Sequence, residues 1–138
     1  MVSLRSFSLF DPFGASDLSK LESLCQKRAL AAGETLFFEG DSATALYIIA
    51  SGEIEISRCR NGDTSRIAIL STSDTVGEMA FFDPAGARGL RNADARALTD
   101  VVLIVILADA LAALGTDEPM LVRRLESIIR ERKNREPS

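Results

Sequence analysis

The chain has no histidine among its 138 residues. This absence excludes the Ser-His-Asp triad, the Cys-His pair and the histidine-ligated zinc site. It also disfavours a metal-dependent cupin, because cupins usually hold their ion through histidines. No other nucleophile-base pair or metal cluster is visible in the sequence. We therefore expect a protein that is not an enzyme and that binds no metal.

Cysteine and long apolar runs are also scarce. Cys25 and Cys59 lie far apart without metal-type spacing. Free thiols in a reducing compartment are the simplest interpretation, and the sequence leaves a single Cys25–Cys59 disulfide open. No apolar run approaches the length of a membrane span, and the first residues lack the pattern of a signal peptide. We expect a cytoplasmic chain without a membrane span.

What the chain does have is enough apolar content for one folded domain. Hydrophobic residues make up 46% of the sequence, which is sufficient to bury a core. The net charge of -4 argues against a general nucleic-acid binder. Basic residues nevertheless gather near the end of the chain, where they are typical of a solvated helix face. They are Arg123, Arg124, Arg130, Arg132, Lys133 and Arg135.

The hydrophobic period divides the chain into helical ends and a β-rich middle. Ser16 can cap an N-terminal helix whose apolar positions, from Leu18 to Cys25, recur at helical spacing. From Ala32 onward short β segments alternate with glycine turns, which is typical of a sandwich or barrel. The predicted strands are Thr35–Phe38, Ala45–Ala50, Glu53–Cys59, Ser65–Leu70 and Val101–Ile106.

Two of these segments carry further predictions. Asn61-Gly62 is a good hairpin turn, which should pair the strand before it with the strand that holds Ile67 and Ile69. The run from Val101 to Ile106 is too short for a membrane helix. Because it is rich in β-branched residues, it should form a strand that is buried on both faces.

Two helices are expected after Leu107. The first should end at Gly115, and the second should be capped by Thr116 or Asp117, with Pro119 in its first turn. The second helix has one apolar stripe, which could lie against the barrel, pair with a second subunit or close over a ligand. The stripe consists of Leu121, Leu125, Ile128 and Ile129.

The segment Gly77-Glu78-Met79-Ala80 has the features of an anion-binding turn. Gly77 lets the backbone approach a ligand closely, and the short helical turn after it would direct free N–H groups at an anion. Glu78 can accept hydrogen bonds from a sugar hydroxyl. Arg91 can give a forked, charged donor to a phosphate.

The order of these motifs resembles the cyclic-nucleotide-binding domain of catabolite-activator-type regulators, kinase regulatory subunits and gated channels. The resemblance extends from Leu9 to Lys133. It depends on five glycine-containing or cassette segments in the family's order, namely 32–34, 39–41, 46–53, 77–80 and 91–101.

The resemblance implies a mainly β fold with flanking helices. It would be a jelly-roll β-barrel at about residues 32–107, with C-terminal helices at about 108–135, in a single domain spanning 1–138. It also implies a ligand site between barrel and cassette, where Glu78 holds the ribose and Arg91 the cyclic phosphate. The implied ligand-binding residues are Gly77, Glu78, Met79, Ala80, Arg91, Asn92 and Ala93, and the candidates for capping the base are Leu125, Ile128 and Ile129.

Three positions bear on whether this site works. Arg88 competes with Arg91 for the phosphate, and the family's spacing of six residues before the alanine at 97 favours Arg91. Asn92 is bulkier than the residue usual there. Asp94 should share a face with Asn92, where a carboxylate would repel a phosphate by about 1 kcal/mol or more, about a tenfold loss in affinity, unless it pairs with an arginine.

The functional hypothesis is a sensor that binds a cyclic nucleotide, with cyclic AMP favoured over cyclic GMP, and that relays binding by moving its C-terminal helices. The alternative is a degenerate barrel in which Glu78 and Arg91 only bridge each other, and which serves as an interaction or dimerisation module of a larger transporter, channel or enzyme. The chain stops five residues after Lys133, so we expect no direct DNA binding. Its other expected partners are a second copy, held through the C-terminal helix, and a linked or separate effector domain.

Overall fold

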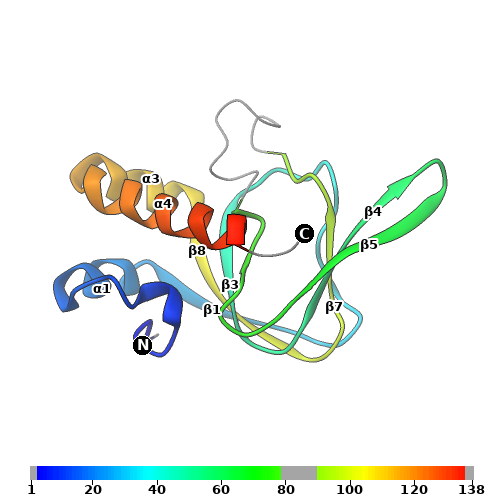
Figure 1. Ribbon diagram of the computed structural model, residues 1–138, viewed down its shortest axis with the longest axis horizontal. Helices are drawn as coiled ribbons and strands as arrows, with labels where there is room; N and C mark the ends of the chain where they lie inside the picture. The colour runs from blue at the N-terminus through cyan, green and yellow to red at the C-terminus, as the bar shows by residue number, and fades with distance from the viewer. Residues whose placement is uncertain (1–2, 79–89, 136–138) are drawn as a thin grey trace.

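The computed structural model describes residues 3–78 and 90–135. They form a helical layer at one end and a β-barrel at the other (Figure 1). The helical layer contains η1 (Ser8–Phe10), α1 (Ala15–Glu22), α3 (Ala108–Asp117) and α4 (Pro119–Arg135). The expected mainly β fold with an N-terminal helix and two C-terminal helices is confirmed.

The barrel consists of two antiparallel sheets of four strands each within the described residues. The first sheet has the order β1-β8-β3-β6, with β1 at Cys25–Leu30, β8 at Val101–Leu107, β3 at Ala45–Ser51 and β6 at Thr75–Val76. The second has the order β2-β7-β4-β5, with β2 at Thr35–Phe37, β7 at Asp94–Ala97, β4 at Ile54–Arg60 and β5 at Asp63–Leu70. Eight strands in two such sheets form the expected jelly roll.

The first sheet lies between two apolar cores. On β8, Ile104 and Ile106 face the helical layer, whereas Leu103 and Val105 face the second sheet. Such alternation follows from the two-residue period of a strand. It explains why this run is apolar throughout, and it confirms the expectation of a strand buried on both faces.

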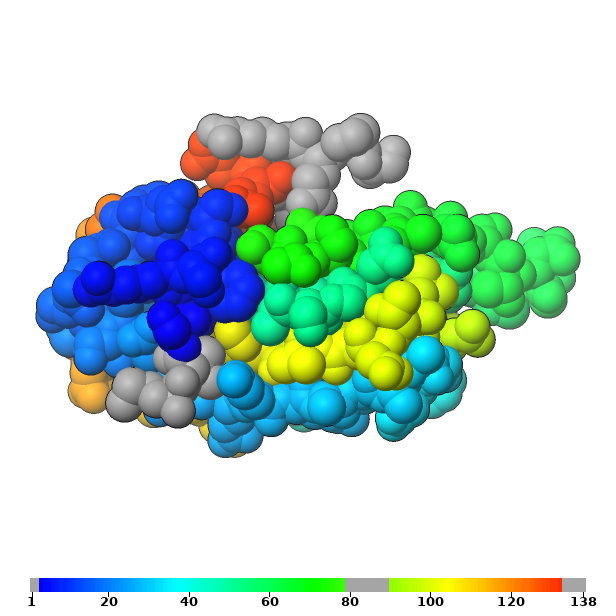
Figure 2. Space-filling view, turned by 90° about the horizontal axis from the view of Figure 1, so that it is seen from below, coloured from blue at the N-terminus to red at the C-terminus, as the bar shows by residue number. Residues whose placement is uncertain are grey.

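The β4–β5 hairpin reaches away from the rest of the barrel (Figures 1 and 2). Its register pairs Glu55 with Ile69 and Arg60 with Asp63, so Asn61-Gly62 is the turn that the sequence predicts. Both turn residues have positive φ, which Asn and Gly tolerate best. One irregularity in the register, at Ile56/Ser57, leaves Ile67 of β5 without a directly opposite partner.

Several helix boundaries differ from the predictions. The N-terminal helix begins at Ala15 after Gly14, so Ser16 lies inside the first turn and is not the cap; the helix ends before Cys25, which belongs to β1. The helix α3 continues through Gly115 to Asp117, so neither Thr116 nor Asp117 precedes α4 as a cap. Gly115 therefore lies inside α3 and does not end it. Pro119 does stand at the first position of α4.

The apolar stripe of α4 packs inside the molecule. Leu121, Leu125 and Ile129 are buried against the N-terminal segment and the first sheet, and Ile128 is partly buried there. Figure 2 shows the N-terminal segment in blue at the end of the molecule opposite the hairpin. The sequence left three roles open for this stripe. In this structure the stripe packs against the chain's own core.

No helix in residues 3–78 and 90–135 is both long and apolar enough to cross a membrane.

Candidate functional site

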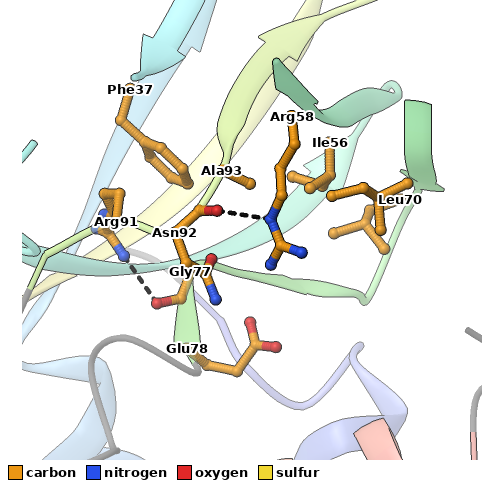
Figure 3. A pocket seen from close by; sticks show the side chains of 10 residues that line it. Phe37, Ile56, Arg58, Leu70, Gly77, Glu78, Arg91, Asn92 and Ala93 are labelled. Atoms are coloured by element: carbon orange, nitrogen blue, oxygen red, sulfur yellow. Dashed lines mark hydrogen bonds between the residues drawn. The ribbon is translucent and has the colours of Figure 1, made fainter. Parts of the chain in front are cut away.

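A cavity of about 180 Å³ opens on the second sheet beside the end of β6. Figure 3 shows that its side chains come from several strands and from the segment leading into β7. The lining residues are Phe37, Ile56, Arg58, Ile67, Leu70, Gly77, Glu78, Arg91, Asn92 and Ala93. Five of the residues that the resemblance implies for ligand binding, Gly77, Glu78, Arg91, Asn92 and Ala93, therefore meet in one cavity.

The backbone of Arg91 is fixed by the turn at residues 38–41. The Arg91 N–H donates to the carbonyl of Asp41 at 2.7 Å, and the Gly40 N–H donates to the carbonyl of Arg91 at 2.8 Å. The Asp41 carboxylate in turn accepts the Phe38 N–H at 2.9 Å. The Glu39-Gly40-Asp41 motif thus holds the arginine in place from a segment 50 residues away in the sequence.

The guanidinium of Arg91 is buried, with 3% of the residue exposed. Its two terminal nitrogens donate to the carbonyls of Gly77 at 2.7 Å and Ala45 at 2.6 Å. It lies 4.4 Å from the centroid of the Phe37 ring and 5.6 Å from that of Tyr47. Its Nε has no hydrogen-bond partner among the described residues. The side chain is therefore rigidly placed and retains donor capacity for a further acceptor.

Burial and neighbouring charges act on Arg91 in opposite directions. Desolvation lowers its pKa from the ordinary value, and Tyr47, Glu78 and Asp41 partly offset this effect. An arginine nevertheless keeps its positive charge in proteins at neutral pH. The cavity therefore contains a fixed cation in a partly dehydrated environment, where an anion is attracted more strongly than in water.

Glu78 follows Gly77 directly and is 2% exposed. Figure 3 shows its carboxylate pointing away from the Arg91 guanidinium, which is instead directed at the Gly77 carbonyl. In the degenerate alternative, Glu78 and Arg91 bridge each other. Here the terminal nitrogens of Arg91 donate to the carbonyls of Gly77 and Ala45 instead. Both side chains line the cavity.

The two unusual residues after Arg91 lie in different environments. Asn92 lines the cavity, and its carbonyl accepts the Nε–H of Arg58 at 2.8 Å. Asp94 is not in the lining, because its carboxylate accepts the Glu39 N–H at 2.7 Å. This carboxylate is held outside the cavity lining by a backbone amide of the turn that also positions Arg91.

Arg58 was missed by the sequence analysis. It lies on β4, lines the cavity and belongs to a hairpin whose other arginines are exposed. A signal was available in the two-residue period of β4, because Arg58 follows Ile54 and Ile56 at alternate positions. The sequence offered no reason to place a charged residue on the inner face.

The remaining predicted site residues fall into two groups. Met79 and Ala80, and the competing Arg88, lie outside the described residues. Leu125, Ile128 and Ile129 belong to the helical core on the far side of the first sheet, and none of them lines this cavity. Within residues 3–78 and 90–135, no group of three or more Cys, Asp or Glu side chains could hold a metal ion.

Comparison with known proteins finds relatives in sequence and in fold. The chain is 30% identical over 133 residues to the CRP-like cAMP-activated global transcriptional regulator of Mycobacterium tuberculosis, covering 96% of this chain and 58% of the regulator. The N-terminal domain of a transcriptional regulator from Streptomyces coelicolor has a TM-score of 0.77 at 28% identity, covering 96% of this chain and 91% of that one. The regulatory domain of Toxoplasma gondii PKA, solved with cAMP, has a TM-score of 0.69 at 26% identity, covering 80% of this chain and 41% of that one.

This chain therefore spans somewhat more than half the length of the Mycobacterium regulator. The family model of the cyclic nucleotide-binding domain matches residues 27–117, which contain the cavity lining and both sheets of the barrel except the first two residues of β1. That match covers well over half of the 138 residues, and the chain belongs to the cyclic nucleotide-binding domain family.

Proposed function

We propose that this chain is a sensor that binds a cyclic nucleoside monophosphate in the cavity beside β6. The observation that carries the proposal is the meeting of a buried arginine, Arg91, with a buried carboxylate, Glu78, at one small cavity. The charged guanidinium suits a phosphate, and a carboxylate suits a sugar hydroxyl. Gly77 and the Asn92-Ala93 segment bring backbone into the same wall.

Cyclic AMP is the proposed ligand in preference to cyclic GMP. The Mycobacterium regulator is named for activation by cAMP, and the Toxoplasma domain was solved with cAMP. In this chain the apolar lining, which includes Ile56, Ile67 and Leu70, offers a surface for a purine. Base capping by Leu125, Ile128 and Ile129 would require α4 to leave its present core, so we assign those residues a packing role in the conformation described here.

The relay would pass through β3. Ala45 accepts a hydrogen bond from Arg91, and the next residue, Leu46, packs in the helical core with Leu125 and Ile129. A ligand that alters how Arg91 is held thus acts on a strand whose other face supports α4. We propose that binding changes the position or stability of the C-terminal helices and involves no catalysis.

A second candidate is a barrel that holds no nucleotide. It is favoured by one observation, that both terminal nitrogens of Arg91 already donate to backbone carbonyls. In that case Arg91 would join β3 to the end of β6, and the chain would act as an interaction or dimerisation module of a larger protein.

Calorimetric titration of the whole chain with cyclic AMP and cyclic GMP separates the two candidates. Arg91→Ala is the test variant, and Arg96→Ala is its control because Arg96 is exposed on the adjacent strand β7. A sensor binds one nucleotide at micromolar Kd or tighter, keeps this affinity in Arg96→Ala and loses it in Arg91→Ala. A folded wild-type chain that binds neither nucleotide contradicts the sensor and supports the second candidate, and hydrolysis of the added nucleotide would contradict the absence of catalysis.

A further inference from the structure

Arg58 differs from the other arginines of the β4–β5 hairpin in what it faces. Arg60 forms an ion pair with Glu39 at 2.9 Å, and Arg66 forms one with Glu55 at 2.7 Å. Arg58 is half-buried and lines the cavity. Arg58 forms no ion pair within residues 3–78 and 90–135, although its charge adds to the hydrogen bond from Arg60 in lowering the pKa of the Glu39 carboxyl.

The position of the Arg58 guanidinium is set by one protein contact. Its Nε–H donates to the carbonyl of Asn92 at 2.8 Å. The two terminal nitrogens of the guanidinium take no part in this hydrogen bond. Figure 3 shows these nitrogens pointing into the cavity, toward the side where Glu78 lies. Among the described residues they have no hydrogen-bond acceptor. The fork is therefore oriented by the protein and has donors left over for a ligand.

The charges of the lining lead to the same conclusion. Among the lining residues, the charged ones are Arg58, Glu78 and Arg91, which sum to +1. A cyclic phosphodiester carries one negative charge, so a bound cyclic nucleotide would make the site neutral. Without Arg58 the same complex would have an uncompensated negative charge in a partly buried cavity.

We propose that Arg58 is a second cationic ligand contact, whose terminal N–H groups donate to the phosphate of the cyclic nucleotide opposite Arg91. The proposal rests on the proposed function, because it concerns the same cavity and ligand. Arg91 is the fixed inner cation, with two of its nitrogens held by protein carbonyls. Arg58 is the outer cation, and both of its terminal nitrogens are directed at the ligand.

The test is titration of the whole chain with the nucleotide that the wild type binds, using Arg58→Gln, Arg58→Lys and Arg60→Ala. Arg60→Ala is the matched control, because Arg60 lies two residues further along the same strand and does not line the cavity. We expect Arg58→Gln to weaken binding about 10- to 100-fold, Arg58→Lys to weaken it less because it keeps the charge, and Arg60→Ala to leave affinity unchanged.

Salt dependence distinguishes a ligand contact from a positioning role. If Arg58 meets the phosphate, the affinity of Arg58→Gln should fall less steeply with salt than that of the wild type, because one ion pair has been removed. Equal losses in Arg58→Gln and Arg58→Lys with an unchanged salt dependence would mean that Arg58 only holds the Asn92 carbonyl, and would overturn the proposal. Wild-type affinity in Arg58→Gln overturns it too. A wild-type chain that binds neither nucleotide overturns the proposed function together with it.

Discussion

Gly77 stands between β6 and Glu78 with a φ of +78°, in the left-handed region that favours glycine. A Cβ at this position would overlap the Arg91 guanidinium, lying 3.0 Å from its Cζ, and would come within 3.3 Å of the Phe37 ring. We expect Gly77→Ala to displace Arg91 and to abolish nucleotide binding. The measurement is a titration of the variant beside its thermal unfolding curve.

The hairpin glycine provides the control for that experiment. Gly62 has a similar φ of +83°, but a Cβ there would meet nothing within 4 Å. Gly62→Ala should therefore lower the free energy of unfolding by about 1 kcal/mol through backbone strain alone. Its affinity for the nucleotide should stay unchanged. If both alanine variants bind equally well, the close approach between Gly77 and Arg91 does not matter for the site.

The two cysteines should differ in reactivity. Burial raises the pKa of the Cys25 thiol to about 12, with a smaller contribution from the charge of Glu22, whereas Cys59 is exposed. Thiolate is the reactive form, so Cys25 should react far more slowly than Cys59 at pH 8. Alkylation rates of the Cys25→Ser and Cys59→Ser variants measure this difference directly. Comparable rates would show that Cys25 is not shielded as described.

The same shift makes a prediction about stability at high pH. Because the pKa of Cys25 is higher in the folded chain than the ordinary value of 9.0, folding favours the protonated thiol. The contribution of the protonated Cys25 thiol to the free energy of unfolding is fully present below pH 9 and is lost as the pH rises toward about 12. The difference in free energy of unfolding between Cys59→Ser and the Cys25→Ala/Cys59→Ser double variant should therefore narrow across that interval. A constant difference would contradict the shift.

Among the elements, α4 has its apolar stripe in the core and its polar side toward solvent. Leu125 is fully buried, so Leu125→Ala should lower the free energy of unfolding by about 2–5 kcal/mol. Met120 lies on the same helix and is 73% exposed, so Met120→Ala should change it by less than about 0.5 kcal/mol. Urea unfolding of both variants gives the comparison. A small effect at Leu125 would mean that α4 does not rest on the core in solution.

The elements also show how far sequence could lead. The apolar run of β8 and the Asn61-Gly62 turn were predictable, because each depends on local composition and period. The strand β1 was missed because it is largely exposed and polar, and it exists only through its pairing with β8. Gly115 was expected to end a helix, but α3 continues past it to Asp117 despite the low helix propensity of glycine.

The candidate site was likewise predictable from sequence only in part. Arg91 and Glu78 could be selected from motif spacing, and they do lie at one cavity. Asp94 could not be judged from sequence, since the Glu39 N–H that it binds is 55 residues away. Arg58 follows Ile54 and Ile56 at alternate positions of β4, but its charge gave no reason to expect it on the inner face.

In the molecule as a whole, the two ends of the chain form one layer. Leu4, Phe7 and Phe10 from the N-terminal segment share a core with Leu121 and Leu125 of α4. Polar contacts reinforce it, because Lys20 pairs with Glu118 at 2.6 Å and the Arg124 guanidinium lies 5.1 Å from the Phe13 ring. Movement of α4 would therefore also disturb the N-terminal segment.

This arrangement makes the relay testable by hydrogen exchange. If binding acts through β3, saturating nucleotide should change exchange protection in α4 and in α1 together, although neither helix touches the cavity. The Arg91→Ala variant under the same conditions should show no change in either helix. Protection that changes only around residues 77–78 and 91–93 would mean that the barrel binds its ligand without any effect on the stability of α1 and α4. In that case any signal would have to leave through the barrel surface, and the C-terminal helices would serve only to cover the first sheet.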